Sequence, residues 1–446
     1  MIVYFGIREN NVDLVIAFAV FLSGVAGCMI FGYGLGWAML LGFFCFFAVG
    51  LHRGFEGKQL LGMAAQGGKT AFLVLRIILL IGVLTGVWRA SGTIAYCVDV
   101  GLRFITPESF VLVAFFLPAV LSLACGSSFG TAGTAGVILM TIAQSGQADL
   151  AVTGGAILSG AYFGERLSPA SSAAALVSAV TDVEQGTFNR QMWKDSVIPL
   201  GLTGIIYGIL SVIFPIAQVD GEIIRALEES FALNWSAALP AIVLLVLPWL
   251  KFSAMQSIAI SCLTAVPVAV LVQGVSLPCL LRFCVLGYEA SHPMLSEILS
   301  GGGMISMAST VVIVFLSCAY ASIFTGTEML APLQAKIAPI ARQKGRILCH
   351  IGVGLCAASL LCNQVGSIVM NRQILAGHYA EHGLSKEEMA RDIGNTVLVL
   401  VGLVPWCIAC SVPLAMMGSG PQAIPFAVYL YLLPAVALMR EVKEKK

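Results

Sequence analysis

The chain has 446 residues, of which 59% are hydrophobic and 11% are charged. Ordinary soluble domains contain about 45–50% apolar and about 25% charged residues, so the composition excludes that class. The 24 Lys and Arg residues balance the 23 Asp and Glu residues, which leaves no basic excess for binding nucleic acid.

Apolar runs of about 20 residues, the length that crosses a bilayer, recur along the chain. In chain order they lie at about 11–31, 35–51, 70–90, 109–126, 127–145, 150–181, 195–217, 234–250, 252–274, 304–324, 346–376, 394–413 and 421–440. The runs at 150–181 and 346–376 are interrupted, and residues 276–303 predict a short span followed by a broken one. The sequence therefore predicts an all-α polytopic membrane protein with about 11–13 transmembrane segments and broken or re-entrant helices.

Basic residues gather in three segments outside the apolar runs, and basic loops of membrane proteins face the cytoplasm. These segments are the loop with His52, Arg53, Lys58 and Lys69, the loop with Lys336, Arg342, Lys344 and Arg346, and the tail at 440–446. We therefore expect a protein of the cell membrane with both termini in the cytoplasm. For the tail to end there, the run at 346–376 must enter the membrane and return as a hairpin of two half-helices.

Two apolar segments are perforated by Gly, hydroxyl and amide residues. Residues 123–140 read LACGSSFGTAGTAGVILM, and residues 360–375 read LLCNQVGSIVMNRQIL. Such segments in corresponding positions of two halves indicate the binding site of a secondary transporter, so we expect them to meet near the bilayer midplane. Their candidate ligands are Ser127, Ser128, Thr131, Thr134, Asn363 and Gln364. The alternatives are close helix packing at the glycines and, for the amides including Asn371, hydrogen bonds that bridge helices.

Two pairs of similar short motifs indicate an internal repeat. The triplet SGT at 91–93 matches the triplet TGT at 325–327, and Cys125 matches Cys362. The two pairs lie at nearly the same offset along the chain (325 − 91 against 362 − 125). We predict four regions: N-terminal spans and a loop at 1–69, a first repeat at 70–217, connecting spans at 218–303, and a second repeat with the tail at 304–446.

Acidic residues within apolar segments are candidates for a functional site, because a charge at the membrane centre costs about 2.5–3.5 kcal/mol. Glu165 lies in the stretch GAYFGERLSP at 160–169, where Gly and Pro break the helix and free backbone carbonyls. We predict that Glu165 is the coupling carboxylate, near a transported sodium ion. The neighbouring hydroxyls that we expect to assist it are those of Ser168, Ser171 and Ser172. The alternative role for Glu165 is an ion pair with Arg166.

Two other acids are further candidates for the transport site. Glu328 and Asp392 could each line the pathway, although each also fits a charge at a helix end. Four histidines lie near predicted loops and are expected at the surface: His52, His350, His378 and His382. The 13 cysteines do not cluster with His at metal-ligand spacing, so we expect neither a structural metal nor a cofactor.

Four segments in fixed order resemble the NhaC family of sodium/proton antiporters. They read GVLTGVWRASGTI at 82–94, GSSFGTAGTAG at 126–136, GAYFGERLSP at 160–169 and GGGMISM at 301–307, and ARDIGNT at 390–396 with VPW at 404–406 resembles a later family motif. The resemblance covers about residues 75–435 and implies an inverted-repeat fold with broken helices and cation-coupled exchange. The chain departs from the family pattern at Glu165, where relatives typically have Asp, and at Ser172, Ala175 and Cys407, where they have Asp, Asn and Asn.

These observations predict a secondary active transporter, a cation-coupled antiporter of the sodium/proton type. The alternative is a carrier of a small amino acid or carboxylate coupled to sodium or protons, which the absent Asp at Ser172 favours. An enzyme or a passive channel is disfavoured, because no nucleophile–base pair is evident and paired broken repeats suit alternating access. The expected partners are the lipid bilayer, a transported cation (sodium, protons or both) and, for the alternative, a small organic solute. The sequence does not decide between a monomer and a homodimer.

Overall fold

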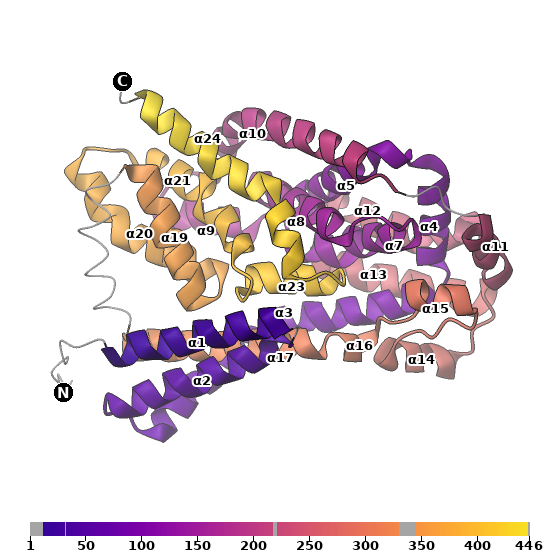
Figure 1. Ribbon diagram of the computed structural model, residues 1–446, viewed down its shortest axis with the longest axis horizontal. Coiled ribbons are helices and arrows are strands. Elements are labelled where there is room, and N and C mark those ends of the chain that lie inside the picture. The colour runs from indigo at the N-terminus through magenta and orange to yellow at the C-terminus, as the bar shows by residue number, and fades with distance from the viewer. Residues whose placement is uncertain (1–11, 32, 217–220, 330–344, 445–446) are drawn as a thin grey trace.

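The computed structural model describes residues 12–31, 33–216, 221–329 and 345–444. These residues form helices and connecting turns, with one isolated β-bridge between Tyr288 and Gly301 (Figure 1). The predicted all-α class is confirmed. The basic residues Lys336, Arg342 and Lys344, on which part of the predicted orientation depends, lie outside the described residues.

The helices up to residue 230 are α1 (Val12–Phe31), α2 (Leu35–His52), α3 (Gly57–Ala90), α4 (Thr93–Phe104), η1 (Pro107–Ser109), α5 (Phe110–Cys125), α6 (Ser128–Thr131), η2 (Ala132–Gly136), α7 (Val137–Ser145), α8 (Leu150–Leu167), α9 (Ser172–Thr181), α10 (Gln185–Ile213) and α11 (Gly221–Ser230). The later ones are α12 (Trp235–Val246), η3 (Leu247–Leu250), α13 (Ala254–Pro267), η4 (Val268–Val272), α14 (Leu277–Leu286), α15 (Pro293–Leu299), α16 (Gly303–Ser306), α17 (Ala308–Thr327), α19 (Arg346–Leu361), α20 (Gln364–Glu381), α21 (Lys386–Asn395), α22 (Val397–Leu400), η5 (Val401–Leu403), α23 (Ile408–Met416), η6 (Pro421–Phe426) and α24 (Val428–Glu444).

Several helices have the length and hydropathy of membrane spans. Within the described residues, five helical segments are long and apolar enough to cross a membrane: Leu35–His52, Pro107–Cys125, Gln185–Ile213, Met255–Val272 and Ala308–Thr327. Three further pairs of helices meet the same criterion only when the two members are taken as one span. They are Leu75–Ala90 with Thr93–Gly101, Ile224–Ser230 with Trp235–Leu250, and Lys386–Leu403 with Ile408–Met416, bent at the break by 73°, 99° and 57°. The protein is therefore a multi-pass membrane protein with broken helices.

The helix bounds of the first half recur in the second half at one constant offset. The starts of α5 and α19 differ by the same amount as their ends (346 − 110 and 361 − 125). The same offset relates the continuous helix formed by α6, η2 and α7 to α20 (364 − 128 and 381 − 145). It also relates α8 to the segment from α21 to η5 (386 − 150 and 403 − 167), and the start of α9 to that of α23 (408 − 172). One helix hairpin and one broken helix therefore occur in each half.

The register of this recurrence differs from the predicted one. The α5 helix ends at Gly126 (φ 66°) and α19 ends at Cys362 (φ 53°), both in the left-handed conformation. Cys362 therefore matches Gly126 rather than Cys125. The left-handed residues Gly92, which precedes α4, and Glu328, which ends α17, lie at the same constant offset (328 − 92). Both predicted pairings are therefore wrong by one or two positions.

Each hairpin turns through the same local structure. After Gly126, the side chain of Ser127 accepts a hydrogen bond from the Gly130 N–H and begins the next helix. After Cys362, Asn363 accepts one from the Gly366 N–H at 2.6 Å and begins α20. A left-handed residue that ends one helix, followed at once by a Ser or Asn cap, reverses the chain within a very short turn.

The broken helices lie against the hairpin tips. A Cβ at Gly126 would meet the backbone of Ala170 and Ser171, in the break between α8 and α9. In the second half the Ile408 N–H, at the start of α23, donates to the Cys362 carbonyl at 2.9 Å. The predicted continuous span at 394–413 is wrong, because the chain breaks at residues 404–407 around Pro405, which lacks the N–H that a helix needs.

Glycine allows α5 and α8 to pack at backbone contact. A Cβ added at Gly160 would meet the carbonyl oxygen of Phe115, and one at Gly164 would meet that of Ala119. Small residues at membrane helix interfaces permit such close approach. In Figure 1 the α19–α20 hairpin lies at the opposite end of the molecule from α11, and α8 lies in its middle.

Candidate functional site

Glu165 lies on α8 just before the helix breaks, and its side chain is buried, with 7% of the residue exposed. Three hydrogen-bonding groups interact with its carboxylate: the hydroxyl of Ser128, the backbone N–H of Ser128 and the side chain of Gln364. The two perforated segments therefore meet at Glu165, since one residue of each contacts the carboxylate.

Both contacting residues begin a helix. Ser128 is the first residue of the helix at 128–145, and Gln364 is the first residue of α20. The side-chain nitrogen of Gln364 also donates to the Leu398 carbonyl at 3.1 Å, which ties the hairpin tip to α22. Helix N-termini carry partial positive charge, so both helix starts attract negative charge on this carboxylate.

One oxygen of the carboxylate has unused hydrogen-bonding capacity. The Oε2 atom of Glu165 is buried and has no hydrogen-bond partner among the described residues. A buried polar atom without a partner is costly and calls for a proton, a cation or a water molecule. Within the described residues no group of three or more His, Cys, Asp or Glu side chains is placed to hold a metal ion. Glu165 and its hydroxyl and amide neighbours are thus oxygen donors of the kind that bind a small hard cation.

Tyr162 belongs to this site and was not predicted. Its side chain is buried, its hydroxyl donates to the Ala409 carbonyl at 2.5 Å, and it also interacts with Ser128. Ala409 lies at the start of α23, so the second broken helix also reaches the site. The signal in the sequence was the i, i+3 spacing of Tyr162 and Glu165, which puts both on one face of α8.

Most of the other predicted hydroxyls and amides make local backbone contacts. Thr131 donates to the Ser127 carbonyl, and Thr134 donates to the Gly130 carbonyl. Ser168 accepts from the Ala170 N–H, Ser171 caps α9 and Ser172 is exposed. Asn371 donates to the His350 carbonyl on α19, as expected for an amide that bridges helices.

Arg166 is not the partner of Glu165. Its guanidinium is fully buried and donates to the Gly394 carbonyl at 2.8 Å, to the Ser196 hydroxyl at 2.5 Å and to the Asn395 side-chain oxygen. These contacts join α8 to α10 and α21. The alternative of a Glu165–Arg166 ion pair is therefore wrong.

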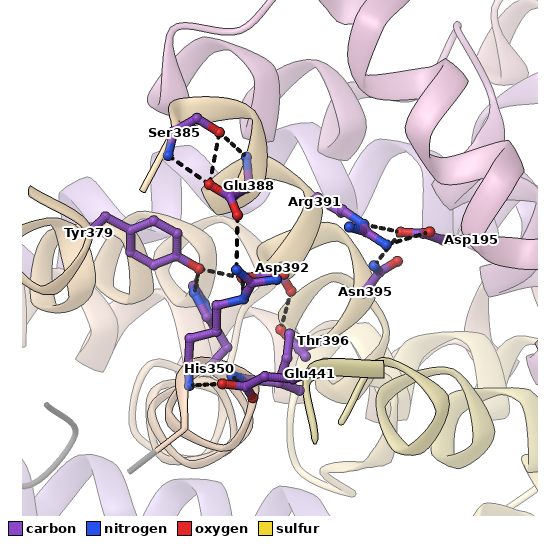
Figure 2. A network of polar contacts seen from close by, with 12 residues as sticks. Asp195, His350, Tyr379, Ser385, Glu388, Arg391, Asp392, Asn395, Thr396 and Glu441 are labelled. Carbon is purple, nitrogen blue, oxygen red and sulfur yellow. Dashed lines mark hydrogen bonds and ion pairs between the residues drawn. The ribbon is translucent and has the colours of Figure 1, made fainter. Parts of the chain in front are cut away.

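The two other predicted acids lie in different surroundings. Asp392 is buried on α21, where the Arg346 guanidinium is 3.0 Å away and the Tyr379 hydroxyl donates to it at 2.5 Å (Figure 2). Glu328 is exposed in the left-handed position that ends α17. Neither is among the groups that interact with the Glu165 carboxylate.

Two histidines expected at the surface are buried. His350 is 0% exposed and His378 is 6% exposed, because both face the interior between α19, α20 and α21. A second polar group was also missed: Asp195 on α10 accepts hydrogen bonds from Arg391 and Asn395 of α21 (Figure 2) and from Arg440 of α24. The hydrogen bonds of Asp195 join the two halves of the chain.

Comparison with known proteins gives a consistent result over almost the whole chain. A family model described as the Na⁺/H⁺ antiporter family matches residues 10–187 and 183–439. The chain is 28% identical over 348 residues to an uncharacterized Na⁺/H⁺ antiporter of Haemophilus influenzae, with 75% of this chain and 74% of the relative covered. It is 25% identical over 404 residues to the malate-2H⁺/Na⁺-lactate antiporter of Bacillus subtilis (88% and 86% covered), and 24% identical over 405 residues to the Na⁺/H⁺ antiporter NhaC of the same organism (88% of each covered).

Proposed function

The chain belongs to the Na⁺/H⁺ antiporter family, and from that premise we propose that it exchanges sodium ions for protons across the cell membrane, with Glu165 binding the two in turn. The chain is thus a transporter rather than an enzyme. The predicted antiporter function agrees with the family and with the relatives that bear that name.

The unpartnered Oε2 atom of Glu165 is the observation that carries this proposal. A carboxylate that has bound a proton is neutral and no longer attracts Na⁺, whereas the ionised form binds it with the help of neighbouring oxygens. One buried carboxylate therefore binds a proton or a sodium ion but not both together. This competition converts binding into exchange, because the site changes its access from one side of the membrane to the other only when one of its two ligands is bound.

The convergence of two hairpin tips and two helix breaks at Glu165 supports alternating access. Both hairpin tips and both helix breaks lie at or next to the site. In transporters of this kind one structural repeat moves against the other around a central site. We assign these roles to the repeats at 70–217 and 304–446, in inverted topology, with both termini in the cytoplasm.

A second candidate is exchange of a small carboxylate or amino acid together with sodium or protons. The observation that favours it is the similarity to the malate-2H⁺/Na⁺-lactate antiporter, which extends over as much of this chain as the similarity to NhaC. The exposed Ser172, where the family pattern has Asp, also removes a charge from the region of the α8–α9 break.

Purified protein in liposomes with a trapped pH-sensitive dye tests the proposal. An inward sodium gradient should drive protons outward in the wild type, and Glu165→Gln should abolish this movement. Glu328→Gln, which removes an exposed acid, is the matched control and should leave the rate unchanged. Failure of sodium to move protons, combined with movement driven by malate, lactate or an amino acid, would replace the antiporter by the second candidate.

A further inference from the structure

Three side chains from three helices form a buried hydrogen-bonded chain apart from Glu165. They are His350 on α19, Tyr379 on α20 and Asp392 on α21 (Figure 2). The Nε2 atom of His350 lies 2.8 Å from the Tyr379 hydroxyl, and that hydroxyl lies 2.5 Å from Oδ2 of Asp392. All three residues are buried, so each polar atom depends on its neighbour.

Asn371 determines which atoms of the His350 ring carry hydrogen. Its side-chain nitrogen donates to the His350 carbonyl at 3.1 Å, which points its oxygen towards Nδ1 of the ring at 2.6 Å. An amide oxygen only accepts hydrogen bonds, so Nδ1 must carry a hydrogen. In the neutral ring Nε2 is then without hydrogen and can only accept.

The hydroxyl of Tyr379 has a single hydrogen for two acceptors. If His350 is neutral and Asp392 is ionised, Tyr379 can donate to one of them, and the other contact pairs two acceptors. One added proton removes this conflict in either of two places. A protonated His350 donates from Nε2 to Tyr379, which donates to the Asp392 carboxylate, or a protonated Asp392 donates to Tyr379, which donates to Nε2.

Burial favours retention of that proton, because its loss leaves a charge on Asp392 away from water, whereas the charged groups around the chain have both signs. Asp392 faces Arg346 of α19 at 3.0 Å, but Arg346 is also paired with Glu388 of α21 at 3.0 Å. Glu441 of α24 accepts hydrogen bonds from the first two backbone N–H groups of α19. The remaining titratable or charged groups nearby are His378 of α20, whose ring lies against Tyr379, and Arg391 of α21, which is paired with Asp195. Three carboxylates thus surround one close arginine. Glu388, with 36% of its side chain exposed, connects the cluster to solvent.

We propose that His350, Tyr379 and Asp392 form a second proton-binding site, which holds one proton shared along the chain and secures the α19–α20 hairpin to α21 while it is occupied. Transfer along the chain breaks the His350 Nε2–H bond as Tyr379 gains that proton, and breaks the Tyr379 O–H bond as Asp392 Oδ2 gains the other. The charges of His350 and Asp392 are neutralised together, and no proton leaves the site.

The position of the hairpin gives this site a role in transport. Its tip residue, Gln364, interacts with Glu165, and α20 continues from there to Tyr379. Loss of the shared proton leaves one of two buried contacts unsatisfied and so loosens the hairpin that forms one wall of the ion site. The transport rate should therefore depend on pH through this chain as well as through Glu165. This effect rests on the proposed function, whereas the shared proton does not.

Nitrogen and carbon NMR on the full-length protein in lipid nanodiscs measures the shared proton directly. The chain has five histidines, so labelled His is assignable by comparison with His350→Gln. In the wild type, the Nε2 signal of His350 and the carboxyl signal of Asp392 should change at one common pH while Nδ1 stays protonated. In Tyr379→Phe the two signals should change separately, with midpoints moved by about one pH unit or more, equivalent to about 1.4 kcal/mol. Glu165→Gln should keep the coupled change although it lacks transport.

Transport in liposomes supplies the second measurement. Tyr379→Phe should shift the pH of half-maximal rate and keep the maximal rate. Tyr431→Phe is the matched control, because the Tyr431 hydroxyl donates only to the Ile424 carbonyl and the residue is 43% exposed. Independent titration of His350 and Asp392 in the wild type, or unchanged titration in Tyr379→Phe, would overturn the proposal.

Discussion

At the scale of single residues, the contacts of Glu165 distinguish it from the other buried acids. Asp195 and Asp392 accept hydrogen bonds or ion pairs from arginine, whereas Glu165 meets a hydroxyl, an N–H group and an amide. An arginine would hold the carboxylate ionised and compete with a transported cation. The constant offset between the two halves places Val401 at the position equivalent to Glu165, so the repeat duplicates the scaffold but not this charge.

Removal of the Ser128 hydroxyl should weaken sodium binding while the fold is retained. A hydrogen bond to a charged group contributes about 1.5–3 kcal/mol, so Ser128→Ala should raise the sodium concentration for half-maximal exchange about tenfold or more. The measurement is the sodium dependence of exchange in liposomes. Thr264→Val is the control, since the Thr264 hydroxyl donates to the Ile260 carbonyl of α13, which does not contact the site. An unchanged sodium dependence in Ser128→Ala would exclude this hydroxyl as a ligand.

At the scale of helices, the site depends on the close contact between α5 and α8. The Cβ atoms of Gly160→Ala and Gly164→Ala would each overlap a carbonyl oxygen of α5. We expect Gly160→Ala to force the helices apart, to lower the thermal unfolding temperature and to reduce exchange. The matched control is Gly208→Ala on α10, where an added Cβ meets nothing within 4 Å and the loss of unfolded-state freedom gives about 0.4–1 kcal/mol of stability. Equal unfolding temperatures for the two variants would contradict the packing argument.

Asp195 joins helices of both halves and should matter for stability rather than for ion binding. Breaking a buried ion pair costs about 3–5 kcal/mol, and we expect about 1–3 kcal/mol for Asp195→Asn because Arg391 and Arg440 are partly exposed. Thermal unfolding in detergent measures this loss. Asp182→Asn removes the partner of Lys386 in an exposed pair and should leave the unfolding temperature unchanged. Wild-type stability of Asp195→Asn would show that the two halves do not depend on this contact.

At the scale of the whole molecule, the sequence predicts the turns and helix breaks that residues adjacent in the chain determine. Gly126 followed by Ser127, and Cys362 followed by Asn363, mark the hairpin turns, and the Gly and Pro residues near Glu165 mark the α8–α9 break. Pro405 likewise marks the break between η5 and α23, because it lacks the N–H that a helix needs. The surroundings of His350 and Asp392 had no such signal, because their partners lie on other helices and no spacing within one segment specifies which helix packs against another.

Exchange at Glu165 requires that sodium and a proton compete for one carboxylate, and infrared difference spectroscopy measures that competition directly. Protein in lipid is held at constant pH, and the carboxylic acid C=O band is recorded before and after addition of sodium chloride, with potassium chloride as the reference. Sodium should remove a band that is present in the wild type and absent from Glu165→Gln, because Na⁺ displaces the proton from Glu165. Failure of sodium to remove the band that is lost in Glu165→Gln, or a sodium-sensitive band that persists in Glu165→Gln, would contradict exchange at this carboxylate.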